Sequence, residues 1–350
     1  MKLAWQEMKR NRARFAILGS IVFLISLLAF IVAGLANGLS RDNAALIADM
    51  PEGQFYMSGE ADGTYSFSAI DPSLQSEVLQ SRDGSMALSI RLGFLNDADG
   101  KQLGVAYVAS VSEEENAKAK MLPTVHPGEV WLDGTLAEKG VAIGDMLTGD
   151  ASSDKAFRVA GFVDGQKFSH APAAFVNPDD YAEMTGRAEM QLLFVPGSPG
   201  ETPAGLEAFT KGELLGSIPS YKAEQLTLNM IIVFLIAIGG LLFGIFFYMM
   251  NVQKMGLYGI LKAIGVRTGA LFRMMWTQMA VVAGIAMLGA AALSALFAAV
   301  APGEMPFRLS GSSMAWLAVL FLVVGFAGSS VSGIQIKKVS PLAAIQQGEM

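Results

Sequence analysis

Cysteine is absent from the 350 residues, and histidine occurs only at His126 and His170. The chain therefore has no disulfide framework, no thiolate nucleophile and no thiolate metal site. Two histidines also exclude a His-rich zinc site. Charge is scarce as well, because charged residues make up 16% of the chain while hydrophobic residues make up 52%. This composition excludes a disordered chain and argues against an ordinary soluble globule.

Four long apolar runs contain no Asp, Glu, Lys or Arg at all. They cover residues 15–36, 227–250, 274–300 and 314–333. A bilayer core of about 30 Å needs roughly 20 apolar residues in a helix, so the runs predict four transmembrane helices. The first run, at 22 residues, is longer than the apolar part of a signal peptide, roughly 7–15 residues. We therefore expect it to be an uncleaved anchor.

Basic and acidic residues are separated along the chain. Segments 1–14, 251–273 and 334–350 together hold 11 basic and 2 acidic residues, whereas segment 38–226 holds 13 basic and 28 acidic residues. Basic loops stay on the cytoplasmic side of a membrane. The distribution thus predicts a multi-pass membrane protein with both termini cytoplasmic. Segment 38–226 and the loop 301–313 would lie outside.

Segment 38–226 is long enough to fold on its own. Runs rich in β-formers, separated by Asp-Gly turns, predict strands at 54–58, 65–70, 87–92, 105–111, 129–132, 157–163 and 191–195. Helices are expected to begin near 177–180 and near Pro203. The predicted fold class is a membrane protein with four transmembrane α-helices. A large extracytoplasmic α/β domain lies between the first and second spans.

Two short amphipathic segments flank the spans. Residues 1–14 predict an elbow helix on the inner leaflet. Within 251–273, Leu257, Ile260, Leu261 and Ile264 are spaced as one apolar stripe, and Lys254, Tyr258 and Lys262 lie elsewhere around the helix. Such a helix either rests on lipid headgroups or docks as a coupling helix in a groove of a cytosolic motor protein.

Pairs of small residues four apart indicate close packing of the spans. They are Gly34 with Gly38, Gly240 with Gly244, and Gly325 with Ser329. Because four spans are few for a transport route, we expect a helix bundle completed by a second copy of the chain.

Catalytic and nucleotide-binding signatures are missing. The sequence has no G-x-x-x-x-G-K-[ST] loop, no HExxH and no DxDxDG, which argues against ATP binding by a P-loop and against a membrane-anchored enzyme. A pump built on this chain would need a separate motor.

The stretch 253–265, QKMGLYGILKAIG, and the tail 337–345, KKVSPLAAI, resemble FtsX/MacB-type ABC permeases. Segments 1–9, 34–39, 218–225 and 228–230 resemble the haem-exporting members of that family. The resemblance implies a location in the bacterial plasma membrane, a homodimer, two copies of a cytosolic ABC ATPase that binds ATP and Mg²⁺, and outward movement of haem as the substrate. It implies no permanently bound cofactor, no metal apart from haem iron and no nucleic acid partner.

Residues at the outer ends of the spans are the candidates for haem contact in a lateral cleft, because His, Met and Tyr are iron ligands and carboxylates less usual ones. The haem-binding candidates near the span ends are Tyr221, Glu224, Met230, Asn229, Asn37 and Phe30, and His170 is a further candidate from a predicted strand-edge loop of segment 38–226. The candidates for pairing with the propionates are Arg41 and Lys222. Each also has a structural explanation, such as an aromatic-belt anchor for Tyr221.

Two other functions fit the same topology. One is an FtsX-like subunit that transmits force to an extracellular cell-wall hydrolase without moving a substrate. The other is a lipoprotein or peptide exporter of the MacB/Lol type.

Overall fold

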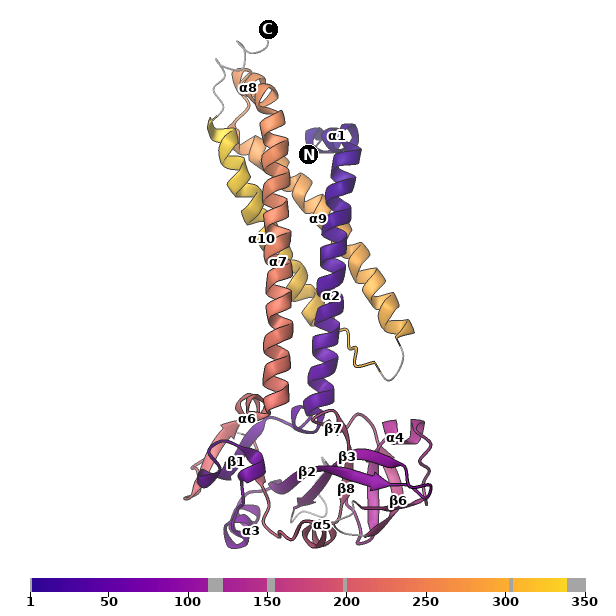
Figure 1. Ribbon diagram of the computed structural model, residues 1–350. Coiled ribbons are helices and arrows are strands. Elements are labelled where there is room, and N and C mark those ends of the chain that lie inside the picture. Colours follow the sequence, from indigo (N-terminus) through magenta and orange to yellow (C-terminus); the bar gives the residue numbers. More distant parts are fainter. Residues whose placement is uncertain (1, 113–121, 150–154, 198–199, 302–304, 339–350) are drawn as a thin grey trace. The chain divides into compact units, whose positions relative to one another are not determined.

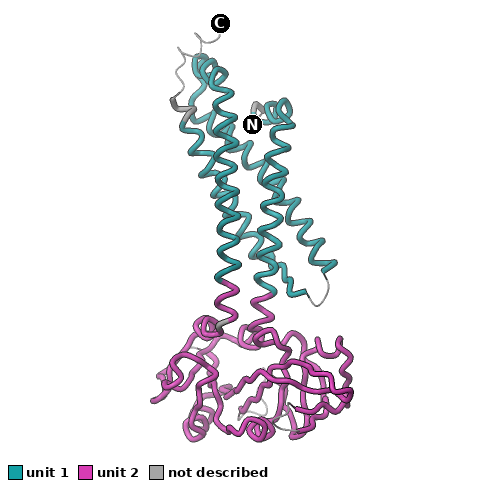
Figure 2. Tube along the Cα trace, in the orientation of Figure 1, with its two compact units in different colours: residues 1–38, 226–350 teal, residues 39–225 magenta. Residues whose placement is uncertain are grey.

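A computed structural model describes residues 2–112, 122–149, 155–197, 200–301 and 305–338 (Figure 1). Most of the predicted cytoplasmic tail, residues 339–350, lies outside this part of the chain. The chain divides into two compact units, which Figure 2 colours separately. Unit 1 comprises residues 1–38 and 226–350, and unit 2 comprises residues 39–225.

Long helices build unit 1. The helices that contribute to it are α1 (Lys2–Arg10), α2 (Arg12–Ala48), α7 (Pro219–Gln253), α8 (Met255–Ala263), α9 (Thr268–Val300) and α10 (Gly311–Lys338). Four of them, α2, α7, α9 and α10, are long and apolar enough to cross a membrane. Helix α2 continues beyond the predicted end at residue 36, and α7 begins before residue 227. In α7 the added turns start at Pro219, a residue suited to the first position of a helix.

Glycines allow α7 and α10 to touch through their backbones. A Cβ atom at Gly328 would clash with the carbonyl oxygen of Gly240, and one at Gly38 would clash with the backbone of Pro306. Close approach of this kind requires residues without side chains. Gly38, Gly240 and Gly244 thus pack within one chain, and the second copy of the chain stays a prediction.

Gly328→Val is expected to force α7 and α10 apart and to lower the free energy of unfolding by about 1–3 kcal/mol, the usual cost of overpacking. Gly284→Val in α9 is the matched control, because a Cβ at Gly284 meets no atom within 4 Å. Thermal unfolding of the purified chain in detergent measures both. Equal melting temperatures for the two variants would contradict the predicted contact.

Unit 2 contains a mixed sheet of ten strands. The strands are β1 (Gly53–Ser58), β2 (Met86–Asn96), β3 (Gln102–Val111), β4 (Glu129–Asp133), β5 (Met146–Thr148), β6 (Ala156–Val163), β7 (Lys167–Phe168), β8 (Ala171–Val176), β9 (Leu192–Pro196) and β10 (Leu206–Thr210). Their order is β10-β1-β9-β2-β3-β8-β4-β6-β5, and β7 pairs with β8. Strand β5 also pairs with β2, at Asn96 and Thr148. The strands β2, β3, β8, β4, β6 and β5 therefore close into a ring.

Both faces of the sheet are apolar and covered. In β1, Phe55 and Tyr56 are both fully buried but belong to different core clusters, because successive side chains of a strand point to opposite faces. The short helices of this unit are α3 (Pro72–Ser81), α4 (Thr135–Glu138), α5 (Pro178–Thr185) and α6 (Lys211–Ser217). Helix α5 begins at Pro178, where the sequence predicts a helix start, and the Asn177 side chain caps it by accepting a hydrogen bond from the backbone N–H of Asp179.

Six of the seven predicted strands are confirmed, as parts of β1, β2, β3, β4, β6 and β9. The strand expected at 65–70 is wrong. Residues Tyr65–Phe67 form a 3₁₀ turn, and the Ser68 hydroxyl accepts a hydrogen bond from the backbone N–H of Ser58 at 3.0 Å. The helix expected near Pro203 is also wrong. Strand β10 follows at Leu206–Thr210. Helix α6 begins at Lys211, where Thr210 and Glu213 form a capping box at its N-terminus.

Candidate functional site

The end of α2 is fastened to the turn between β7 and β8. Ala44 leaves the helical conformation, with φ −145° and ψ 18°. The carbonyl oxygens of Asp42 and Asn43 accept hydrogen bonds from the backbone N–H groups of His170, at 3.1 Å, and Ser169, at 2.6 Å. The turn thus satisfies carbonyl groups near the kink in the helix.

Asn43 is the centre of a polar cluster inside unit 2. Its side chain is fully buried. The Nδ2 atom donates to Ser220 Oγ at 3.0 Å and to Glu224 Oε2 at 3.3 Å, and it lies 3.3 Å from His170 Nε2. Ser220 Oγ in turn donates to Asn43 Oδ1 at 3.1 Å. One buried amide of α2 therefore orients side chains from α7 and from the β7–β8 turn.

His170 and Glu224 form the accessible edge of this cluster. Their Nε2 and Oε1 atoms are 2.8 Å apart, and the side chains are 40% and 27% exposed. An imidazole and a carboxylate are both possible metal ligands, and these two are accessible to solvent. No group of three or more metal-ligating side chains occurs among the described residues. The pair could thus complete the coordination of a metal that arrives with ligands of its own.

The remaining candidates in unit 2 surround the cluster with differing availability. Tyr221 is half-buried against an apolar core of that unit, and Lys222 is exposed. Arg41 pairs with Asp49, with Nη2 and Oδ2 2.6 Å apart. Arg41 is therefore already neutralised, whereas the ammonium group of Lys222 is accessible to an anionic ligand.

Four candidates belong to unit 1. Phe30 is buried in the helix-bundle core, and Asn37 donates a hydrogen bond to Ser313 Oγ at 3.2 Å. Asn229 and Met230 are exposed on α7. Phe30 thus acts as a packing residue in this conformation. Sequence analysis missed Asn43 and Ser220, although a buried asparagine near the end of a long helix is a residue type that requires hydrogen-bond partners.

A second polar cluster joins α1 to the predicted coupling helix. Glu7 forms a buried ion pair with Lys254, and Gln278 Nε2 donates to Glu7 Oε2 at 2.8 Å. Burial lowers the pKa of Lys254 to about 8, and the adjacent carboxylate opposes this loss of charge. Tyr258 donates to Asn251 Oδ1 at 3.1 Å, and burial raises the pKa of Tyr258 to about 12.

The apolar stripe of α8 is open on this chain. Leu257, Ile260 and Ile264 are 50%, 52% and 73% exposed, whereas Leu261 packs against the bundle core. Lys254 and Tyr258, which we expected among the coupling contacts, are buried inside the bundle. They can position α8 but cannot reach a partner in this conformation, because their polar groups are committed to Glu7 and Asn251.

Comparison with known proteins finds similarity in part of the chain to one permease family and over its whole length to named permeases. Residues 229–341, which run from α7 through α10, match the FtsX-like permease C-terminal family. Over its whole length the chain is similar to proteins named as hemin transport system permease protein HrtB.

Two of these relatives come from staphylococci. The one from Staphylococcus epidermidis is 26% identical over 362 aligned residues, which cover 100% of both proteins. The one from Staphylococcus haemolyticus is 25% identical over 357 residues and covers 99% of each. Among solved structures, the periplasmic region of MacB from Actinobacillus actinomycetemcomitans matches 48% of this chain and 92% of its own, with 11% identity and a TM-score of 0.35.

Proposed function

We propose that this chain is the permease subunit of an ABC-type exporter that expels haem from the plasma membrane. It would act as a homodimer with two copies of a separate, HrtA-like ATPase, which binds ATP and Mg²⁺. The observation that carries the proposal is the partly exposed His170–Glu224 pair, held by the buried Asn43, in a chain whose full-length relatives are named for hemin transport.

The chemistry of haem suits such a pair. The porphyrin supplies four ligands to the iron, so the protein needs to add only axial ones. Histidine is a common axial ligand and a carboxylate a less usual one. His170 or Glu224 would bind the iron once the hydrogen bond between them breaks. Tyr221, which lies on the same helix as Glu224, would be a further contact for the haem. Lys222, which is exposed, would pair with a propionate as a point charge.

The exposed stripe of α8 supports docking of the ATPase. Leu257, Ile260 and Ile264 are uncovered on one short helix, as expected of an amphipathic helix that fills a groove on a partner. The ion pair between Glu7 and Lys254 would hold α8 to α1, so that a push on α8 also moves the start of α2. Rigid-body rotation of the spans would then narrow a lateral cleft and release haem outward.

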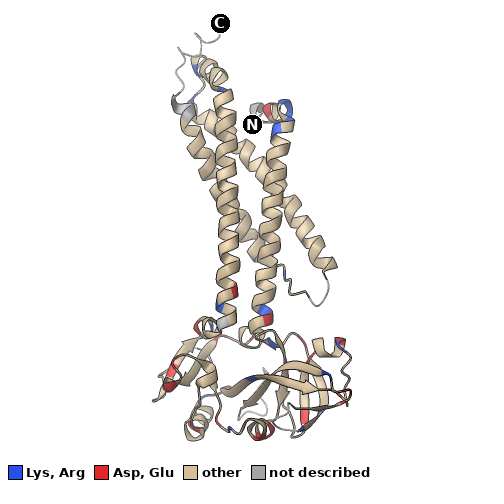
Figure 3. Cartoon of the chain, in the orientation of Figure 1, with Lys and Arg blue, Asp and Glu red and all other residues tan. Residues whose placement is uncertain are grey.

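Orientation follows from charge. Basic residues gather at α1, α8 and the start of α9 in unit 1 (Figure 3), which by the positive-inside rule would face the cytoplasm. Both termini would then be cytoplasmic, and residues 39–225 would form an extracytoplasmic domain. Exposed apolar side chains along α7, among them Val233, Phe234 and Leu241, would face lipid or the second copy.

The test is haem-stimulated ATP hydrolysis by the assembled complex. The chain is co-expressed with a candidate HrtA-like ABC ATPase, purified as a complex and placed in liposomes. We expect haem to raise the hydrolysis rate and the complex to show a Soret band, whereas the ATPase alone should show neither. A rate that is indifferent to haem, with an intact complex, would instead favour an FtsX-like subunit that transmits force and moves no substrate.

A further inference from the structure

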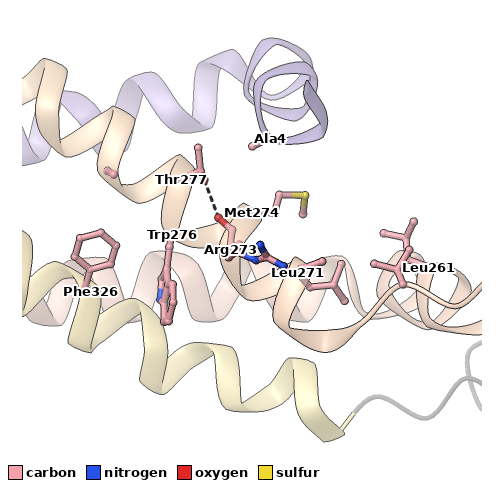
Figure 4. Close-up of a pocket in the computed structure, with 11 residues that line it drawn as sticks. Ala4, Leu261, Leu271, Arg273, Met274, Trp276, Thr277 and Phe326 are labelled. Carbon is pink, nitrogen blue, oxygen red and sulfur yellow. Dashed lines mark hydrogen bonds between the residues drawn. The ribbon is translucent and has the colours of Figure 1, made fainter. Parts of the chain in front are cut away.

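A cavity of about 660 Å³ opens within unit 1, whereas the His170–Glu224 pair belongs to unit 2. Its walls come from α1, α8, α9, α10 and the connection between α8 and α9 (Figure 4). The volume lies within the roughly 300–1,000 Å³ typical of sites for small molecules. The residues that line it include Ala4, Leu261, Leu271, Arg273, Trp276 and Phe326.

Apolar surface dominates the interior of this cavity. Trp276 makes edge-to-face contacts with Phe272 and Phe326, with ring centroids 6.1 Å apart in each case. Its indole N–H donates to Ser330 Oγ at 3.0 Å, so the ring is fixed in position. Thr277 has its hydroxyl group committed to the carbonyl oxygen of Arg273 at 2.8 Å. The walls thus suit a hydrocarbon chain rather than a polar solute.

Arg273 supplies the charge at this cavity. Its guanidinium group belongs to an exposed side chain, and within the described residues no carboxylate lies within ion-pair distance of it. The nearby Glu7 is already paired with Lys254. Segment 251–273 contains four basic residues and no acidic one. A cation beside an apolar cavity, at the basic end of a helix bundle, matches the headgroup of an anionic lipid.

We propose that this cavity binds an anionic phospholipid of the inner leaflet. The headgroup phosphate pairs with Arg273, and an acyl chain lies against Leu271, Trp276 and Phe326. Because Leu261 of α8 and Ala4 of α1 also line the cavity, the bound lipid fixes the coupling helix against the elbow helix. The lipid is thus a regulator of the permease, and this proposal does not depend on the nature of the transported substrate.

Brominated lipids test the proposal, because bromine quenches tryptophan fluorescence at short range. The full chain is purified in detergent and titrated with dibrominated phosphatidylglycerol or dibrominated phosphatidylcholine at equal mole fractions. Subtracting the signal of Trp276→Phe isolates quenching at Trp276 from that of the other tryptophans. We expect about fivefold stronger apparent binding of phosphatidylglycerol, the contribution of one basic residue to an anionic lipid.

Two arginine variants provide the matched comparison. Arg273→Gln should remove the preference for phosphatidylglycerol, whereas Arg267→Gln, at an exposed arginine that does not line the cavity, should keep it. Equal quenching by both lipids, or a preference that survives Arg273→Gln, would overturn the proposal. It would also be overturned if haem, and not phosphatidylglycerol, quenched Trp276 in an Arg273-dependent way, because the cavity would then be a substrate site.

Discussion

Glu224→Gln is expected to weaken haem binding by about 10- to 100-fold, the range found when a metal site loses a supporting group, and to sensitise cells to haem. Glutamine keeps the size of the side chain. Its amide oxygen can replace Oε2 as the acceptor for Asn43 Nδ2, and its NH2 group can replace Oε1 opposite His170 Nε2. The negative charge, however, is gone. Titration of the Soret band on the purified complex measures the affinity, and growth in haem-containing medium measures the tolerance.

Two further variants separate a direct role from a structural one. Glu207→Gln, on the exposed strand β10 of the same unit, is the charge-matched control and should leave both readouts unchanged. His170→Asn preserves the backbone, since asparagine tolerates the positive φ found at this position, and it removes the imidazole. If both Glu224→Gln and His170→Asn leave the Soret band and the tolerance at wild-type values, this pair does not contact haem.

Lys254→Met should lower the free energy of unfolding by about 3–5 kcal/mol, because it leaves the buried carboxylate of Glu7 without a counter-charge. The side chains of Lys254 and Glu7 are only 11% and 14% exposed. Gln278 keeps one hydrogen bond to Glu7. This hydrogen bond reduces the loss of stability but does not replace the positive charge of Lys254. Thermal unfolding of the full chain in detergent measures the change.

Removing the partner as well provides the critical comparison. Glu7→Met combined with Lys254→Met should recover most of the lost stability, since replacing a whole buried ion pair by apolar side chains is often neutral or favourable. Arg10→Met, at an exposed position on α1, serves as control and should shift stability by less than about 0.5 kcal/mol. Additive losses in the double variant would show that the two side chains are not coupled.

The membrane helices could be predicted because the signal is local and strong. A run of about 20 uncharged residues leaves few alternatives to a spanning helix. The ends of the helices were less predictable. The turns beyond residue 36 in α2 and before residue 227 in α7 are polar, and their helical state depends on contacts such as that of Asn43 with Ser220. These contacts join residues far apart in sequence.

Strand prediction failed where a side chain had a better partner than the sheet. Segment 65–70 has β-forming residues, but Ser68 is buried and bonded to the end of β1. Strand β8 was missed because the sequence APAAFV carries neither alternation nor a turn signal that marks it as a strand. Its pairing with β3 and β4 is decided by burial on both faces.

Some residues of the candidate site could be predicted from the sequence, but the contacts between them could not. Tyr221 and Glu224 were selected from their spacing on one helix, and His170 from its scarcity. Nothing local could show that His170 meets Glu224, which lies 54 residues away, or that Asn43 lies between them. In the same way, the exposed stripe on α8 was readable from its period, whereas the burial of Lys254 depended on Glu7 at the other end of the chain.

The turn that carries His170 has one more consequence. Ser169 and His170 both adopt the left-handed conformation, with φ values of 51° and 65°, which costs a residue with a side chain roughly 1–2 kcal/mol. A pair such as Asn-Gly would make the same hairpin without that cost. Replacing Ser169 and His170 by Asn-Gly is therefore expected to raise the free energy of unfolding. The same replacement would remove the imidazole of His170. Selection for stability would therefore favour Asn-Gly in this turn, whereas selection for the proposed haem contact would favour His170.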